Sequence, residues 1–333
     1  MSVGRSGRRP TLEDVAARAG VSRAMVSIVL RGAAGSRPAT RDRVMQAAEE
    51  IGYRPDARAR LLASDSSRQI GVVLGMDSRF QADLLDGLYV AAGKAGYELI
   101  LSALTPSRDE RAAVDSLLDF RPEAVILLRP GTEAAPRLSG RFPVTVVGWR
   151  VADPAVDVVR TSDDEGMRRA VGHLVGCGHR SIAHVDGGPY PVASARRRAY
   201  RAAMRRHGLD PYIHVIRGGN DMAAGARAAR PLLDAPTRPT AVIGFNDDVA
   251  AGLLDTLAST GVRVPEDLSI VGWDDHALAR LPHLNLTTVR QDAVEMSRLA
   301  VERSVERLRG VSVDKREVVL RPQLVVRGST APP

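Results

Sequence analysis

Three short stretches near the amino terminus carry apolar residues at helical spacing. In TLEDVAARAG the apolar residues recur every three or four positions, and Gly20 follows the last of them. The second stretch begins at Ser22, a residue type that caps helices, and the third has Pro38 in its first turn. The tight Gly20-Val21-Ser22 connection therefore predicts a helix-turn-helix unit within a small all-α head that ends near residue 53.

The pattern changes after residue 68. Apolar runs of strand length then alternate with helical stretches, and the runs include QIGVVLG, ELILSAL, EAVILLR, VTVVGW, SIAHVDG, AVIGFND and LSIVGWDD. Alternating buried strands and helices are typical of parallel sheets covered on both faces. Because these strands are too many for one small sheet, we predict an α/β body of two doubly wound parallel-sheet lobes. The polar, basic stretch RPDARARLLASDSSR reads as a linker that can hold a short helix.

Charge is distributed unevenly along the chain. Residues 1–68 contain thirteen arginines and seven acidic residues, a net charge of +6, whereas the other 265 residues carry only +2. A general preference for arginine would spread this excess evenly. A basic head on a nearly neutral body instead indicates a polyanionic partner, and we interpret that partner as nucleic acid.

Several classes of protein are disfavoured by what the sequence lacks. No apolar run approaches the roughly 18 residues that cross a bilayer, and no apolar signal core follows the basic start. The single cysteine, Cys177, forms no internal disulfide and no cysteine-based metal cluster. Neither GxGxxG after a strand nor GxxxxGK[ST] is present. We therefore expect a cytoplasmic protein with no membrane partner, no cofactor and no metal.

Successive motifs resemble one family, the bacterial transcription regulators of the lactose-repressor/galactose-repressor (LacI/GalR) type. The motifs, in order, are TLEDVAARAGVS, TRDRVMQAAEEIGYRPD, HLVGCGHRSIAHVDGG, FNDDVAAGLLDTLASTGVRVPEDLSIVGWDD, LTTVRQD and LVVRGST. The resemblance implies a homodimer, possibly a tetramer, on a double-stranded, pseudo-palindromic DNA operator. It also implies a periplasmic-binding-protein-like body that holds a small-molecule effector, a sugar or other small metabolite, between its lobes.

The resemblance also implies domain boundaries. We expect a helix-turn-helix domain at 1–53, a hinge helix and linker at 54–68, and an effector-binding and dimerisation domain at 69–333. Within that domain the N-lobe comprises about 69–161 and 293–322, and the C-lobe about 162–292 and 323–333. The chain would cross between the lobes near Thr161-Ser162, near Asp292 and near Pro322-Gln323.

The expected DNA contacts lie at the start of the first helix, on the second helix and just after it, on the third helix and in the hinge. They are Thr11, Ser22, Arg23, Ala24, Ser27, Arg31, Arg41, Ala59 and Leu62. The start of the second helix would enter the major groove, where Arg23 could read a guanine or only hold a phosphate. Arg31 and Arg41 suit phosphate contacts. Leu62 matches the family's minor-groove wedge, with Ala59 one turn earlier, although a leucine there could instead pack on its own lobe.

Five residues match effector-contacting positions of the family: Phe80, Trp149, Arg196, Asn246 and Asp274. Arg196 lies in an arginine run that could also be a solvated helix face, and Trp149 could stack on a ligand or simply pack beneath its loop. Gly148 stands where sugar-responsive members often place an aspartate, which weakens the case for a sugar. We expect Asp275, next to Asp274, to be structural.

Three functions compete at this point. The leading hypothesis is an operator-binding transcription regulator, with repression as its expected mode, that a small molecule controls. A free-standing solute-binding protein shares the two lobes but has no use for a basic head and needs an export signal. An α/β enzyme could use His173, His179, His184 and Asp186, but the histidines lack the i, i+4 spacing of a metal site and no GxSxG is present. We therefore expect no enzymatic activity.

Overall fold

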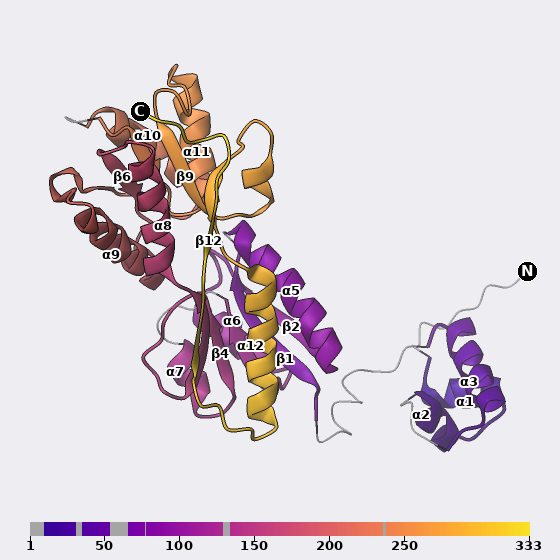
Figure 1. Ribbon diagram of the computed structural model, residues 1–333. Coiled ribbons are helices and arrows are strands. Elements are labelled where there is room, and N and C mark those ends of the chain that lie inside the picture. Colours follow the sequence, from indigo (N-terminus) through magenta and orange to yellow (C-terminus); the bar gives the residue numbers. More distant parts are fainter. Residues whose placement is uncertain (1–9, 31–34, 54–65, 77, 129–133, 236–237) are drawn as a thin grey trace, which may run out of the picture. The chain divides into compact units, whose positions relative to one another are not determined.

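The computed structural model describes residues 10–30, 35–53, 66–76, 78–128, 134–235 and 238–333. The chain divides into two compact units, Met1–Ser67 and Arg68–Pro333. Figure 1 shows the helical first unit, which we call the head, and the larger α/β second unit, which we call the body. Each unit has a hydrophobic core of its own.

Within its described residues, the head contains α1 (Leu12–Ala19), α2 (Arg23–Leu30) and α3 (Pro38–Glu50). Its core is built from small and branched side chains of all three helices: Val15, Ala16, Ala19, Val26, Val29, Val44, Ala47 and Ala48. These positions face inward because they recur at helical spacing. The helix-turn-helix prediction is confirmed in the relative placement of these three helices within the head.

Local chemistry fixes the ends of the first two helices. The Thr11 hydroxyl accepts a hydrogen bond from the Asp14 backbone N–H, and the Asp14 carboxylate accepts one from the Thr11 backbone N–H at 2.7 Å, which forms a capping box. Gly20 ends α1 in the left-handed conformation with φ +64°. Ser22 Oγ accepts from the Met25 N–H at 3.2 Å and so caps the start of α2.

The first sheet of the body has six parallel strands, and its elements form the N-lobe. Their spatial order is β11 (Glu317–Leu320), β5 (Val156–Thr161), β4 (Val144–Val147), β3 (Ala124–Leu127), β1 (Gln69–Gly75) and β2 (Glu98–Leu104). Helices α5 (Arg79–Ala95) and α12 (Ala293–Leu308) share one core with the sheet, and α6 (Glu110–Leu118) and α7 (Ala134–Ser139) share the core on its other face. The sheet is therefore doubly wound, as predicted.

The second sheet also has six strands, and its elements form the C-lobe. Their spatial order is β12 (Gln323–Val325), β10 (Thr287–Arg290), β9 (Ser269–Asp274), β8 (Ala241–Ile243), β6 (Ile182–Val185) and β7 (His214–Ile216). Helices α10 (Met222–Leu233) and α11 (Asp247–Ser259) cover one face, and α8 (Asp163–Gly176) and α9 (Pro191–Arg206) cover the other. Short 3-10 turns lie at η1 (Asp210–Tyr212) and η2 (Ala277–Arg280).

One strand departs from the expected parallel pattern. The edge strand β12 pairs with β10 in the antiparallel direction, whereas the other pairs of this sheet are parallel. Only the two residues Arg321 and Pro322 separate β12 from β11, which lies in the other sheet. The chain passes between the two sheets here, between β5 and α8, and between β10 and α12.

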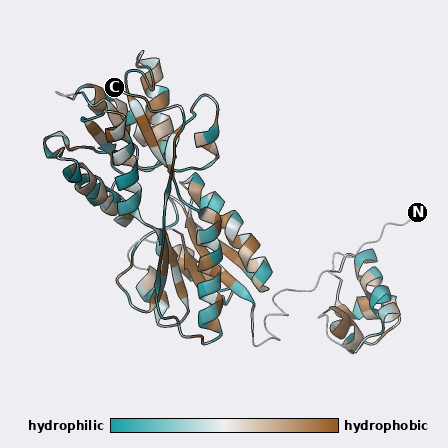
Figure 2. Cartoon of the chain, viewed as in Figure 1, coloured by the Kyte–Doolittle hydropathy of each residue, from teal (hydrophilic) through white to brown (hydrophobic). Residues whose placement is uncertain are grey.

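The hydropathy of the elements matches their layers. In Figure 2 the central strands of both sheets are mostly brown, whereas the covering helices alternate between brown and teal. Strands buried on both faces read as continuous apolar runs, while helices bury only one side. This contrast is why the sequence pattern separated strands from helices in the body.

Candidate functional site

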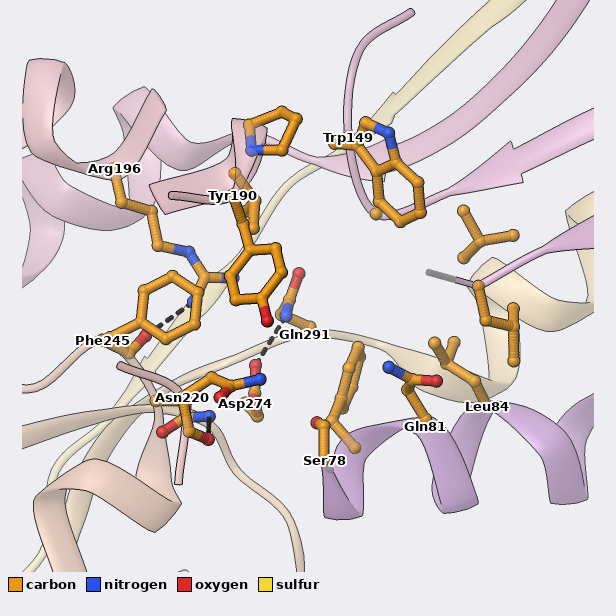
Figure 3. Close-up of a pocket in the computed structure, with 17 residues that line it drawn as sticks. Ser78, Gln81, Leu84, Trp149, Tyr190, Arg196, Asn220, Phe245, Asp274 and Gln291 are labelled. Atoms are coloured by element: carbon orange, nitrogen blue, oxygen red, sulfur yellow. Dashed lines mark hydrogen bonds between the residues drawn. The ribbon is translucent and has the colours of Figure 1, made fainter. Parts of the chain in front are cut away.

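A pocket in the body is lined by residues from both lobes and holds about 770 Å³ of empty space, part of it open to solvent. Figure 3 shows its lining side chains converging from the two sides. Phe80, Trp149, Arg196, Asn246 and Asp274, the five residues singled out from the sequence, all line this one pocket. The C-lobe residues among them lie near the carboxyl ends of parallel strands, where such sheets bind ligands.

Arg196, on α9, is held rigidly and is not on a solvated helix face. Its residue is only 4% exposed. Its guanidinium carbon lies 4.3 Å from the Trp273 ring centroid and 4.8 Å from the Phe245 ring centroid. Nε donates to Asp163 at 3.2 Å, and Nη1 donates to the Phe245 carbonyl at 2.6 Å. Because the Arg196 guanidinium is already ordered, its side chain loses little further conformational entropy when a ligand binds it.

Asp163 shows how burial and pairing oppose each other here. Burial raises the pKa of its carboxyl, while the nearby Arg196 guanidinium lowers that pKa in part. Asp163 begins α8, directly after the first passage between the lobes. The arginine of the pocket is thus tied to the segment that joins the two lobes.

Asp274 supplies a buried carboxylate at the end of β9. Burial raises its pKa, and Arg196 and His276 oppose that rise. Gln291 Nε2 donates to Asp274 Oδ1 at 2.7 Å, which orients the carboxylate (Figure 3). The backbone of Asp274 has φ +114°, a region that few non-glycine residues adopt. Such strain is kept where the surrounding structure holds a side chain in a required position.

Asp275 has a different environment. Its side chain is fully buried, and its oxygens accept hydrogen bonds from Arg290 at 2.6 Å and Arg327 at 2.5 Å. Arg280 lies 3.5 Å from the same carboxylate. Three arginines from η2, β10 and the carboxyl-terminal segment therefore meet at one charge. Asp275 is absent from the pocket lining, which agrees with the structural role expected for it.

The other three predicted residues combine packing with exposure to the pocket. Asn246 Oδ1 accepts from the Val249 N–H and caps α11, so its position is set by the helix. Phe80, in the first turn of α5, packs into the N-lobe core and also lines the pocket. Trp149 is half-buried, packs against the N-lobe core and also lines the pocket. Packing beneath its loop and contact with a ligand are therefore compatible. Gly148 has φ +109°, a conformation that an aspartate at this position would rarely adopt.

Sequence reasoning did not single out several further residues of the pocket. These include Gln81, Tyr190, Asn220, Phe245 and Gln291. Tyr190, Asn220, Phe245 and Gln291 follow β6, β7, β8 and β10, so the rule that ligands bind at the carboxyl ends of strands could have found them. Gln81 Oε1 accepts from the Gly75 N–H at 2.7 Å, a contact with no signature in the sequence.

A charged contact joins the two lobes beside the pocket. Arg79, in the first turn of N-lobe α5, is hydrogen-bonded and ion-paired to Asp248 in the first turn of C-lobe α11. The Asp248 side chain is only 4% exposed, and His276 Nε2 lies 3.7 Å from its second oxygen. Burial disfavours the charged forms of both groups, yet their mutual attraction and Arg79 leave the pKa of Asp248 lowered and that of His276 raised. This interlobe ion pair involves residues that the sequence analysis did not connect.

The histidines considered for catalysis are hydrogen-bonded to other parts of the fold or buried within it. His179 makes hydrogen bonds with Thr240, Ser269 and the Ala331 carbonyl, which ties strands to the carboxyl terminus. His184 is fully buried, and burial lowers its pKa to about 4. Within the ranges that the structure describes, no group of three or more His, Cys, Asp or Glu side chains is arranged to hold a metal.

The head presents part of the predicted DNA-contacting set at its surface. Ser22, Arg23 and Ala24 are exposed at the start of α2, and Ser27 is partly exposed one turn later. Arg23 lies 3.3 Å from Glu13 in a solvated ion pair, which is a weak interaction. The remaining members of the set are Arg41, exposed on α3, Thr11, engaged in the capping box, and Arg31, Ala59 and Leu62, which lie outside the described residues.

A helix-turn-helix head and a two-lobed body with a pocket between its lobes define the class of ligand-controlled DNA-binding regulators. A family model described as "Bacterial regulatory proteins, lacI family" matches residues 11–56, and one described as "Periplasmic binding protein-like domain" matches 171–330. The Escherichia coli (strain K12) ribose operon repressor is 31% identical over 329 residues, which cover 96% of this chain and 99% of that protein. The chain belongs to the lacI family of bacterial transcription regulators.

Solved structures similar to this chain support the same family assignment. A LacI transcriptional regulator from a Rhodococcus species is 43% identical, with a TM-score of 0.76 over 79% of this chain and 98% of that one. The lac repressor dimer bound to operator and the anti-inducer ONPF is 27% identical, with a TM-score of 0.85 over 97% of this chain and 100% of that one. In the described part of the chain, no helix is long and apolar enough to span a membrane.

Proposed function

We propose that this protein is a repressor that binds a pseudo-palindromic operator as a homodimer and whose operator affinity is set by a small molecule held between the lobes. The observation that carries this proposal is the pocket itself. It is lined from both lobes and contains an ordered, buried guanidinium and carboxylate, Arg196 and Asp274. A ligand that contacts both walls changes the relative free energies of different lobe arrangements.

The basic head supplies the DNA contact in this proposal. Ser22, Arg23, Ala24 and Ser27 are offered to the major groove, with Arg23 as the residue that reads a base. Arg31 and Arg41 contact phosphates, while Ala59 and Leu62 act in the minor groove. The operator-bound lac repressor dimer, which is similar in structure to this chain, supports this assignment. Thr11 fixes the start of α1, and this holds the backbone of that turn near the DNA.

The dimer is supported by apolar side chains on the N-lobe surface. Tyr89 and Val90 on α5 are about half exposed, and Leu101 on the neighbouring edge strand β2 is 40% exposed. Exposed apolar residues gathered on adjoining elements are typical of an interface. A two-fold dimer places two heads at two half-sites, which matches a pseudo-palindromic operator. A tetramer remains an alternative assembly of the same dimers.

We also propose that the protein catalyses no reaction and acts in the cytoplasm. The family is one of transcription regulators, and the similar ribose operon repressor is named for repression. The histidines that could serve an enzyme are committed to strand contacts or buried with a lowered pKa.

Residues 54–68 serve as the hinge and linker, and the three passages between the sheets act as the pivots of lobe movement.

The experiment that tests this function is selection of bound duplexes from a random pool by the full-length protein, with and without a small-molecule extract of cells. We expect a two-half-site sequence whose recovery changes when the extract is present. The body alone, residues 68–333, is the control and should recover no sequence. Recovery of no preferred duplex, or turnover of a metabolite without duplex binding, would contradict the proposal.

A further inference from the structure

Helix α9 carries more net positive charge than any other described helix of the body. The segment 187–209, which contains α9, has six arginines and no aspartate or glutamate. Because residues 69–333 together carry a net charge of only +2, the rest of the body is net negative. The excess positive charge of the body is therefore local to this helix.

Two of these six arginines are used within the fold. Arg196 is 4% exposed and lines the pocket, and Arg197 is ion-paired to the buried residue Asp186. The other four are exposed: Arg198, Arg201, Arg205 and Arg206. Arg205 lies 3.1 Å from the exposed Asp210, which is a weak, solvated pair. The remaining three form no ion pair within the described part of the chain, so their charges are available to a partner.

The exposed arginines share one face of α9. The spacing i, i+3, i+7 places Arg198, Arg201 and Arg205 in one row, and Arg206 flanks the end of that row. At about 1.5 Å per residue, the stretch from 198 to 206 is roughly 12 Å long. Ala202, exposed between these arginines, is too small to keep a partner away from the helix. The opposite face packs in the C-lobe core, so the backbone that carries the arginines is fixed.

The location of α9 leaves this face uncovered within the body. None of the four arginines lines the pocket between the lobes. In Figure 1 α9 lies on the outer side of the C-lobe, well away from α5 and β2, which carry the apolar residues assigned to the dimer. The chain enters the body at Arg68, in the N-lobe. The arginine face is therefore separate from the ligand pocket and from the proposed dimer surface.

A row of guanidinium groups without apolar neighbours suits phosphates. Among the described residues, none of the large apolar side chains that are exposed lies on α9, whereas protein partners and membranes are held through such side chains. Tyr200, the aromatic residue of α9, is fully buried, so the helix offers no ring on which unpaired bases could stack. Duplex DNA needs neither feature, because roughly 12 Å of duplex presents about seven phosphate charges in a regular array.

We propose that the exposed face of α9 binds the phosphate backbone of duplex DNA without reading its sequence. The face consists of Arg198, Arg201, Arg205 and Arg206, and it is a second DNA-contacting surface in addition to the head. Phosphate contacts position a protein on DNA but carry no sequence information, so this surface enriches no sequence in a selection. It raises the affinity of the protein for duplex DNA of any sequence. The inference does not depend on the operator or the effector of the proposed function.

The salt dependence of duplex binding by the full-length protein tests this inference. The probe is a fluorescent duplex of random sequence, and its anisotropy is measured at several salt concentrations. The test variant replaces the whole face: Arg198→Gln, Arg201→Gln, Arg205→Gln and Arg206→Gln. Because each lost phosphate contact releases fewer counterions, the plot of log affinity against log salt should become less steep by about 2 or more. At about 0.1 M salt the affinity should fall about tenfold or more.

A second variant controls for total charge. It replaces four exposed arginines elsewhere in the body: Arg141→Gln, Arg227→Gln, Arg230→Gln and Arg309→Gln. This variant removes the same net charge but leaves α9 unchanged. Its salt slope should therefore change by less than about 1, because charges distant from the bound duplex are screened.

Photo-crosslinking shows directly whether DNA lies against α9. Ala202, in the centre of the arginine face, is replaced by p-benzoylphenylalanine in the full-length protein, and Ala223 is replaced in the control. Ala223 is exposed on α10, which covers the other face of the C-lobe sheet. We expect the random duplex to cross-link at position 202 and not at position 223. Poly-glutamate at equal charge concentration should not displace the duplex from position 202.

Three results would overturn the inference. They are equal salt slopes for the two fourfold variants, equal cross-linking at positions 202 and 223, and displacement of the duplex by poly-glutamate at equal charge. The last result would indicate an acidic protein as the partner of α9. Failure of the full-length protein to enrich any operator would reject the proposed function and leave this inference standing.

Discussion

At the scale of single residues, the pocket depends on how one arginine is held. Arg196 lies between the Trp273 and Phe245 rings and is bonded to Asp163 and to a backbone carbonyl. Trp273 can occupy its place only because α8 carries Gly166 opposite the ring. A Cβ at residue 166 would lie 2.3 Å from the tip of the indole. Gly166 of the C-lobe therefore leaves room for Trp273, and Trp273 in turn packs against Arg196 of the pocket.

Gly166→Ala should therefore lower the free energy of unfolding of the body by about 1–3 kcal/mol, because the indole has to move within a packed core. Gly172→Ala, on the same helix, is the control. No atom lies within 4 Å of a Cβ there, so this change should be neutral or stabilise the body by up to about 1 kcal/mol. Urea denaturation of the three proteins measures the difference. Equal stability of the two variants would show that Trp273 is not tightly packed against Gly166.

His184 predicts how stability depends on pH. Burial lowers its pKa from 6.5 to about 4, so between these values the unfolded chain binds a proton that the folded chain does not. Stability should decrease as the pH falls from about 6.5 towards 4, by about 1.4 kcal/mol per pH unit of this shift. His184→Leu should show a shallower decrease over the same window. Denaturation at several pH values tests this, and parallel curves for both proteins would exclude the histidine as the cause.

At the scale of elements, the ion pair between α5 and α11 joins the lobes directly. Arg79 and Asp248 each lie in the first turn of their helices, and His276 supports the buried carboxylate. The contact exists in the lobe arrangement seen here and is lost if the lobes separate at this edge. It contributes a free-energy difference between lobe arrangements, although the exposure of Arg79 keeps that contribution small.

Arg79→Met should consequently shift the ligand-free protein towards arrangements with more widely separated lobes. Small-angle scattering of the body should give a larger radius of gyration for this variant than for the natural sequence. Arg111→Met removes an exposed pair with Asp115 inside the N-lobe and serves as the control, with no change expected. An unchanged radius for Arg79→Met would show that other contacts fix the lobes.

The sequence predicted these elements unevenly. Long apolar runs such as QIGVVLG predicted β1 correctly, because a strand buried on both faces has a continuous apolar sequence. The strands β5, β7, β10, β11 and β12 were not among the predicted runs, because each contains polar or charged residues and so lacks a continuous apolar sequence. In the site, the five residues inferred from family resemblance line one pocket. The sandwich around Arg196 and the Arg79–Asp248 pair could not be predicted, because they join residues far apart in the chain.

At the scale of the whole molecule, the two units differ in net charge and in the kind of ligand they bind. Most of the net positive charge lies in residues 1–68, and the ligand pocket lies in the body. The described part of one head has three helices and a small core, so by itself one head covers few phosphates. Two heads joined through a dimeric body bind with a higher effective concentration.

Residues 1–67 alone should accordingly bind the selected operator about a hundredfold more weakly than the full-length protein. The affinity of the full-length protein should fall steeply with added salt, because DNA binding releases counterions. Fluorescence anisotropy with a labelled duplex at several salt concentrations measures both effects. Equal affinity of the head and the full-length protein for one operator would contradict a bivalent dimer.

The most direct measurement of the central claim is a titration of the selected operator with the full-length protein, with and without the small molecule that binds the pocket. The natural sequence and Asp274→Ala are compared, because Asp274 lies in the pocket and not in the head. We expect the small molecule to change operator affinity about tenfold or more for the natural sequence. We expect Asp274→Ala to retain the ligand-free affinity and to lose the response. A normal response in Asp274→Ala, with unchanged affinity for the small molecule, would contradict the central claim.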